Sequence, residues 1–216
     1  MRHKKDFIPA MGYDWLTGFY DLGIKLFMPE KKFRTRLIDE LQPASGETIL
    51  EFGFGTGQNL ILVHERNAQT TLNGVDIDPK VKAIADHKIN KLGYHLPLDL
   101  YDGKTFPYGN NSFDKVFSSL VFHQLDTASK QSCLKEIYRV LKPGGILVIG
   151  DWGKARSGLM RFAFYAVQLT DGFKITNDSV KGLLPLYIDQ AGFKDVTESG
   201  YINTTIGSYS YYRARK

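Results

Sequence analysis

The sequence predicts an α/β domain built from parallel strands that alternate with helices. From Thr48 onward, short apolar runs end at turns and lead into helical stretches, which is the pattern of strand and helix alternation. The chain has 216 residues, of which 43% are apolar, so it can bury one sizeable core. It carries no internal repeat and no low-complexity linker. We therefore expect a single domain over residues 1–216.

The elements follow in order along the chain. Residues 7–42 are aromatic and amphipathic, and they predict two helices broken near Pro29. After them the pattern predicts strands at 48–52, 71–76, 96–101, 114–119 and 146–151, with helices at 58–66, 79–92 and 128–141. Pro97 cannot donate to a ladder, so the third strand is expected at a sheet edge. The Lys-Pro-Gly-Gly run at 142–145 is expected to close a helix and turn the chain into the next strand.

The last third of the chain adds further elements to this core. A second aromatic and apolar stretch covers residues 159–169, and a helix is expected at 179–191, ending at Gly192. Residues 193–199 and 208–213 predict two strands joined by a loop that contains Gly200 and Gly207.

Composition excludes several classes of protein. No uninterrupted apolar run approaches the roughly 20 residues that cross a bilayer. Asp6 and Pro9 interrupt the basic start, so we expect no secretory signal and a cytoplasmic protein. The single cysteine, Cys133, cannot form an internal disulfide, and no Cys/His cluster has zinc-site spacing, so no metal is expected.

The charge excess is modest. The 28 Lys and Arg outnumber the 23 Asp and Glu, which gives a net charge of +5. Small basic concentrations at residues 31–36 and 213–216 weakly favour anionic partners or a lipid surface, although a solvated face is the simpler interpretation. No basic stripe with interleaved aromatic residues is present, so we expect no nucleic-acid partner.

A glycine-rich turn follows the first predicted strand and leads into a helix. Gly53, Gly55 and Gly57 stand at alternate positions, where the absence of a Cβ lets the backbone approach a bound molecule. The helix that follows offers unpaired N–H groups at its start. A dinucleotide fingerprint would need a third glycine at Gln58, so a pyrophosphate ligand is disfavoured.

Asp76 ends the second predicted strand, nineteen residues after Gly57. In a doubly wound sheet this strand lies beside the first, so the Asp76 carboxylate is expected next to the glycine turn, where it can accept both hydroxyls of a ribose. The alternative role, capping the helix that begins at Pro79, suits Asp78 better.

With these residues the sequence resembles the class I S-adenosylmethionine-dependent methyltransferases, and in particular the branch of ubiquinone/menaquinone-biosynthesis C-methyltransferases and small phospholipid N-methyltransferases. The resemblance covers nearly the whole chain. The matching blocks, in order, are EFGFGTG at 51–57, VDID at 75–78, DGKTFP at 102–107, NSFDKV at 111–116, LVFHQ at 120–124 and RVLKPGG at 139–145.

The resemblance implies a fold and a set of cofactor contacts. It implies a doubly wound, mostly parallel, seven-stranded Rossmann-like sheet with an antiparallel last strand and helical lid segments. Residues 1–42 would form the N-terminal helical lid, 43–152 the cofactor-binding core, 153–192 the cap around the acceptor and 193–216 the C-terminal strands. The cofactor would be S-adenosylmethionine, with S-adenosylhomocysteine as product. The methionine part would contact Gly53, Gly55 and Gly57, with Glu51 at its ammonium group, and the ribose would bind Asp76. The adenine would lie against Ile77, Asp102 and Gly103, Ser118 would contact the cofactor through its backbone, and Tyr13 and Tyr20 would belong to the lid.

The chemistry requires mainly that a nucleophile lie in line with the sulfur–carbon bond and that water be excluded. His123 follows the fourth strand on the ligand edge and is the candidate general base, or else a histidine packed under the lid. The aromatic residues near 159–169, with Trp152 and Tyr187, indicate a small hydrophobic or aromatic acceptor. Arg156 and Arg161 keep a lipid acceptor and peripheral membrane contact open; the oligomeric state is not indicated.

Three alternatives to this function are nucleic-acid methylation, oxidoreduction and cofactor binding without catalysis. Base N-methylation is disfavoured because residues 118–121 lack the Asp/Asn-Pro-Pro-aromatic segment, and C5-cytosine methylation because Cys133 lacks a preceding proline. An NAD-dependent oxidoreductase is disfavoured by the missing third glycine. A non-catalytic S-adenosylmethionine-binding protein stays open, since intact cofactor blocks do not prove turnover.

Overall fold

The computed structural model describes residues 30–216, except for the side chain of Thr170. The first predicted N-terminal helix, Pro29, Tyr13 and Tyr20 lie outside the described residues. The elements in chain order are α2 (Glu30–Leu41), β1 (Thr48–Phe52), α3 (Gln58–Arg66), β2 (Thr71–Asp76), α4 (Pro79–Lys91), β3 (Leu98–Leu100), β4 (Phe113–Ser119), the 3-10 helix η1 (Phe122–Gln124), α5 (Thr127–Val140), β5 (Leu141–Trp152), α6 (Gly158–Ala163), α7 (Tyr165–Asp171), α8 (Phe173–Lys181), α9 (Leu184–Gln190), β6 (Lys194–Asn203) and β7 (Ser208–Arg215).

The strands form one seven-stranded sheet in the order β3-β2-β1-β4-β5-β7-β6. The pairs from β3 to β5 are parallel, whereas β7 runs antiparallel to both β5 and β6. The predicted doubly wound sheet with an antiparallel last strand is therefore confirmed. β3 stands at an edge of the sheet, as Pro97 predicts, because that residue cannot donate to a second neighbour.

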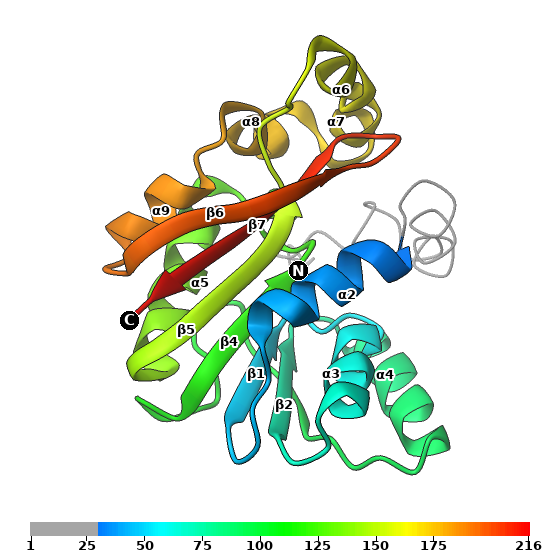
Figure 1. Ribbon diagram of the computed structural model, residues 1–216, viewed down its shortest axis with the longest axis vertical. Helices are drawn as coiled ribbons and strands as arrows, with labels where there is room; N and C mark the ends of the chain where they lie inside the picture. The colour runs from blue at the N-terminus through cyan, green and yellow to red at the C-terminus, as the bar shows by residue number, and fades with distance from the viewer. Residues whose placement is uncertain (1–29) are drawn as a thin grey trace, which may run out of the picture.

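Helices cover both faces of the sheet (Figure 1). On one face α2, α3 and α4 bury a core that includes Phe33, Leu60 and Tyr209. On the other face α5 and α9 bury a second core around Leu134 and Ile188. The helices α6, α7 and α8 lie together beyond the carboxyl end of β5, away from the main layers (Figure 1). We call these three helices the cap.

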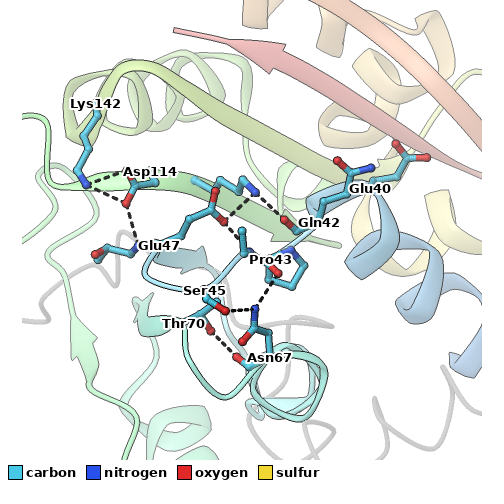
Figure 2. A network of polar contacts seen from close by, with 12 residues as sticks. Glu40, Gln42, Pro43, Ser45, Glu47, Asn67, Thr70, Asp114 and Lys142 are labelled. Atoms are coloured by element: carbon cyan, nitrogen blue, oxygen red, sulfur yellow. Dashed lines mark hydrogen bonds and ion pairs between the residues drawn. The ribbon is translucent and has the colours of Figure 1, made fainter.

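The amino ends of the central strands are joined by polar contacts on the side of the sheet away from the glycine turn (Figure 2). Asp114 accepts hydrogen bonds from the backbone N–H of Thr48 at 2.9 Å and from Lys142 Nζ at 2.8 Å. Lys115, which is buried, pairs with Glu47 at 2.8 Å. Ligands of open α/β sheets bind at the opposite, carboxyl edge, so we assign this network to stability.

Four predicted boundaries are wrong. The strand expected at 193–199 extends to Asn203, so Gly200 lies within β6, in register with Tyr211, and not in the loop. The helix expected at 179–191 is two helices, because Gly182 adopts a left-handed φ of 70° that ends α8 and α9 begins only after it. The Lys-Pro-Gly-Gly run lies within the bounds of β5, where a register irregularity between Phe113 and Lys115 accommodates it. The third strand is shorter than predicted, covering only Leu98–Leu100.

Candidate functional site

The glycine turn lies at the carboxyl edge of the sheet, between the ends of β2 and β4. Gly53, Gly55 and Gly57 all have left-handed φ angles, of 72°, 51° and 78°. These angles favour glycine, since a Cβ there meets the neighbouring carbonyl. Gly57 is the N-cap of α3 and provides no side-chain cap, so the start of this helix keeps donor groups for a ligand. The sheet order reverses between β1 and β4, which is where ligands of this fold class bind.

Gly53 is also required by a neighbour that the sequence did not reveal. A Cβ built on Gly53 would lie 2.3 Å from Cγ2 of Val121, in the segment after β4. The backbone of that segment is itself constrained, since Leu120 has a φ of 57°. The glycine turn and the segment that begins η1 are therefore packed directly against each other.

Asp76 ends β2 beside this turn, as predicted. Its Oδ2 accepts the backbone N–H of Gly55 at 2.9 Å, and its Oδ1 accepts those of Ile77 at 2.7 Å and Asp78 at 3.1 Å. Burial raises the pKa of Asp76, and these three hydrogen bonds oppose that rise. The carboxylate thus fixes the turn as well as facing the ligand edge. The helix cap of α4 is Asp78, which accepts from Lys80 N at 2.8 Å, also as predicted.

Glu51, one residue before the end of β1, is fully buried. Its Oε1 accepts from Asn59 Nδ2 at 2.7 Å, and Asn59 Oδ1 in turn accepts from Arg34 Nη1 at 2.6 Å. Its Oε2 has no hydrogen-bond partner among the described residues. Burial raises the pKa of Glu51 to about 8, against the opposing effects of Asn59 and Arg34. A buried carboxyl oxygen without a partner is costly, and a bound cation or donor would satisfy it.

Ile77 and Gly103 lie side by side at the far end of the turn. A Cβ on Gly103 would lie 3.2 Å from Ile77 Cδ1, so the glycine allows the Ile77 side chain to approach its backbone. Asp102 is exposed, and its Oδ1 accepts the backbone N–H groups of Thr105 at 2.9 Å and Lys104 at 2.8 Å. These hydrogen bonds lower the pKa of Asp102. Both are made to Oδ1, so Oδ2 keeps its lone pairs for another donor.

Ser118 is fully buried in β4, and its Oγ donates to the carbonyl of Phe52 at 2.8 Å. Its side chain therefore joins the ends of β4 and β1, and its backbone is in register with Phe52 of β1 and Ile149 of β5. The cofactor contact implied for its backbone stays a prediction.

His123 lies in η1 and is almost completely buried, between two carboxylates. Its Nδ1 is 2.7 Å from Asp151 Oδ1, and its Nε2 is 3.4 Å from Asp171 Oδ2 in the cap. Burial alone would lower the pKa of His123, but Asp151 and Asp171 raise it to about 9. An imidazole that already holds its proton at neutral pH cannot accept another, so these surroundings favour the packed histidine over the general base.

Asp151 organises the backbone around this histidine. Its Oδ2 accepts the N–H of Phe122 at 2.7 Å and that of His123 at 3.3 Å, and its Oδ1 accepts the N–H of Trp152 at 2.7 Å. A second ion pair joins core and cap nearby: Lys130, which is buried in α5, lies 2.9 Å from Asp178 of α8. A small cavity lies between these two ion pairs.

The aromatic residues expected to line one acceptor wall are divided among three places. Trp152 and Phe164 are buried in the core with Tyr209. Leu184 and Tyr187 belong to the opposite core, and they line the small cavity together with His123. Phe162 and Tyr165 are exposed, by 71% and 42%. Trp152 also lines this cavity, so three of the expected residues, Trp152, Leu184 and Tyr187, share one small cavity, whereas Phe162 and Tyr165 face away from the core.

Several site residues were not predicted from the sequence. Arg34 and Asn59 orient Glu51, and Asp151 and Asp171 hold His123. Asp151 carried a usable signal, because it ends a buried strand at the ligand edge. Asp171 and Arg34 carried none, since their partners lie far away in the sequence. Tyr20, expected in the lid, falls outside the described residues.

Comparison with known proteins agrees with this geometry. Residues 50–149 match the family model described as a methyltransferase domain. An uncharacterized methyltransferase of Synechocystis is 27% identical over 190 residues, which cover 86% of this chain and 84% of that protein. A demethylmenaquinone methyltransferase of Thermus thermophilus is 31% identical over 140 residues, which cover 65% of this chain but only 60% of the relative.

The fold is shared with solved structures. A SAM-dependent methyltransferase from Aquifex aeolicus superposes with a TM-score of 0.62 at 22% identity, covering 89% of this chain and 91% of the other. At this identity the likeness shows the fold alone. Together with the matching domain and the sheet order, it shows that residues 50–149 form a methyltransferase domain and that the described chain has the fold seen in S-adenosylmethionine-dependent methyltransferases.

Proposed function

We propose that this chain binds S-adenosylmethionine in its glycine turn and transfers the methyl group to a small hydrophobic or aromatic acceptor. The observation that carries the proposal is Glu51 Oε2, a buried carboxyl oxygen beside the turn with no partner among residues 30–216. The ammonium group of the cofactor's methionine part would supply the missing donor and a positive charge. A ligand without a hydrogen-bond donor at this point would leave the oxygen unsatisfied.

The remaining groups suit the other parts of the same molecule. Asp76 would accept the ribose hydroxyls, and the apolar surface of Ile77 and Gly103 would hold the adenine ring. Asp102 Oδ2 would accept from the adenine amino group, and the backbone at Ser118 would lie alongside. Gly53, Gly55 and Gly57 would leave room for the methionine part.

When bound, this cofactor supplies a methyl group already activated by a sulfonium. The chain then has to hold the acceptor in line with the sulfur–carbon bond and exclude water. Orientation of this kind can lower a barrier by roughly 7–11 kcal/mol. The cap is placed to provide it, since α7 and α8 are joined to the core through His123–Asp171 and Lys130–Asp178.

We assign His123 to positioning. As an imidazolium between Asp151 and Asp171, it would hold the cap against η1 and β5 rather than take a proton from the acceptor. The acceptor must then lose its proton to water or to a group outside the described residues, or need no deprotonation. This role predicts that His123→Gln raises KM for the acceptor while the affinity for S-adenosylhomocysteine stays close to that of the wild type. A base would instead lower kcat and change its pH profile.

Two observations support an apolar acceptor. The small cavity beside His123 is lined by Trp152, Leu184 and Tyr187, and a relative is named a demethylmenaquinone methyltransferase. A quinol-type ring that is methylated at carbon or oxygen is the acceptor class that we favour, with a lipid amine as the second candidate.

The test is release of S-adenosylhomocysteine from S-adenosylmethionine, measured with naphthoquinols, with a phospholipid amine and with a small water-soluble amine. We expect turnover only with the apolar acceptors, and Asp76→Asn should reduce it. Turnover with the water-soluble amine alone would overturn the acceptor class. Tight binding of S-adenosylhomocysteine with no turnover would favour a non-catalytic binding protein, and stabilisation by NAD instead would favour the oxidoreductase.

A further inference from the structure

The cap carries an exposed apolar patch that the proposed chemistry does not use. Its side chains are Leu159, Phe162, Tyr165, Leu169 and Phe173, with exposed fractions of 70%, 71%, 42%, 75% and 52%. The aromatic members are contiguous: the ring of Tyr165 lies 6.2 Å from that of Phe162 and 6.2 Å from that of Phe173. We call these five residues the cap patch. Large apolar side chains gathered in this way mark an interaction surface.

The charged side chains around the cap patch are mostly basic. Residues 154–174 contain four basic residues, Lys154, Arg156, Arg161 and Lys174, and a single acid, Asp171. Asp171 is only 12% exposed, because it faces His123 in the interior. Arg161 lies over the ring of Tyr165, 4.4 Å from its centroid, so positive charge borders the apolar surface directly. Arg156 lies over the ring of Tyr201 in β6, and its charge is balanced by an ion pair with Glu198.

We infer that the cap patch docks on the surface of an anionic phospholipid bilayer. An apolar face of aromatic and aliphatic side chains, bordered by Lys and Arg, is the composition that lies in the interface between headgroups and acyl chains. Among residues 30–216 no helix is long and apolar enough to cross a membrane, so the contact proposed is peripheral.

Charge favours a bilayer over the two other candidate partners of the cap patch, a second copy of the chain and residues 1–29. In a symmetric dimer the same basic residues would face one another across the interface and repel. The chain's own residues 1–29 contain four Lys and Arg and three Asp and Glu, so they offer no excess of negative charge. A bilayer with anionic headgroups provides both the apolar phase and the opposite charge.

The patch also stands at a useful place in the fold. It follows the carboxyl end of β5, the same sheet edge that carries the glycine turn (Figure 1). Docking there would turn the ligand edge toward the lipid. This inference does not require methyl transfer, because vesicle binding can be measured without any acceptor, and its failure would leave the proposed function untouched.

The experiment is sedimentation of the full chain with vesicles of phosphatidylglycerol and phosphatidylcholine, compared with vesicles of phosphatidylcholine alone. We expect binding to the anionic vesicles that weakens with added salt. The variant Leu159→Ser/Phe162→Ser/Leu169→Ser should lower the partition coefficient about tenfold or more, because the apolar contact is lost. Arg161→Gln/Lys174→Gln should remove the preference for anionic vesicles.

The matched control is Leu92→Ser, which changes a leucine that is 49% exposed at the other side of the molecule, after α4. This control should bind vesicles like the wild type. All variants should keep the wild-type affinity for S-adenosylhomocysteine, which shows that they are folded. The inference is overturned if the triple variant binds like the wild type, or if the wild type ignores anionic vesicles. It is also overturned if the triple variant only converts a dimer to a monomer, or if binding appears only after removal of residues 1–29.

Discussion

Glu51 is an unusual side chain for the interior, because it is fully buried and only one of its carboxyl oxygens is hydrogen-bonded among the described residues. Its pKa, raised by burial to about 8, means that the free protein holds a proton there at neutral pH. A cation placed beside Oε2 would favour the charged form and expel that proton. Ligand binding and ionisation of Glu51 are therefore linked.

This linkage predicts proton release when S-adenosylhomocysteine binds near pH 7. The release should disappear in Glu51→Gln, whose amide cannot titrate, and the affinity should fall by about 1–3 kcal/mol. Calorimetry in two buffers of different ionisation enthalpy measures the number of protons released. The control is Glu65→Gln, an exposed residue of α3. Equal proton release by wild type and Glu51→Gln would remove Glu51 from the ammonium site.

Asp76 both holds the glycine turn and faces the proposed ligand, so its replacement by alanine and by asparagine should have different effects. Because it accepts from the N–H groups of Gly55, Ile77 and Asp78, Asp76→Ala would loosen the turn as well as the ligand contact. Asp76→Asn keeps one acceptor oxygen, so we expect cofactor affinity to fall by about 1–3 kcal/mol with a smaller loss of thermal stability. Asp86→Asn, at a surface ion pair with Lys82, is the control. An unchanged dissociation constant in Asp76→Asn would show that the ribose assignment is wrong.

At the scale of elements, the glycine turn packs against the segment after β4 where Gly53 meets Val121. Gly53→Ala would place a methyl group against Val121 in addition to the strain of a left-handed φ. We expect it to lower the free energy of unfolding by about 2–4 kcal/mol and to weaken cofactor binding. The second substitution Val121→Ala should recover part of that loss, because it removes the clash.

Gly46→Ala is the matched control for this pair of variants. It has a φ of 81° and nothing within 4 Å of a built Cβ, so its cost is backbone strain alone, about 1–2 kcal/mol. Chemical denaturation measures all four proteins. If Val121→Ala does not restore part of the free energy of unfolding lost in Gly53→Ala, then the contact between Gly53 and Val121 is not the cause of that loss.

The ion pairs of His123 make the attachment of the cap depend on pH. The folded-state pKa of about 9 lies above the ordinary 6.5, so the charged histidine stabilises the fold fully below pH 6.5, and this contribution is lost as pH rises through 9. The raised pKa of Glu51 has the same sign, so the wild-type curve alone cannot separate the two groups. Comparing the wild type with His123→Gln isolates the contribution of His123, because Glu51 is the same in both proteins.

We expect the stability difference between wild type and His123→Gln to be largest at or below pH 6.5, about 2–3 kcal/mol, and to shrink above pH 9. Urea unfolding at the two ends of this range measures it. A difference that does not change with pH would mean that His123 is neutral throughout, and the general-base role would return.

At the scale of the whole molecule, the features that can be predicted from the sequence are those set by residues close together in the chain. The bounds of β1, β2 and α3 agree with prediction, because an apolar run followed by glycine or by Asp-Pro marks its own end. The break at Gly182 was missed, because a glycine inside an apolar helical pattern does not reveal its φ. Asp76 lies beside the glycine turn as predicted, because consecutive parallel strands are usually neighbours in a sheet.

The parts that were not predicted depend on contacts across the fold. Arg34 reaches Asn59 from an element 25 residues away, and Tyr211 reaches the backbone of Phe33 over 178 residues. The charge state of His123 depends on Asp171, whose position is set by the packing of the cap. No local pattern encodes such pairings, and they changed the interpretation of the histidine.

The central claim is that the glycine turn, with Glu51 and Asp76 beside it, holds the adenosyl cofactor. The most direct measurement is a crystal structure of the full chain with S-adenosylhomocysteine. The account predicts the amino group within hydrogen-bonding distance of Glu51 Oε2, the ribose on Asp76 and the adenine against Ile77 and Gly103. Ligand density elsewhere, with the turn empty, would contradict it.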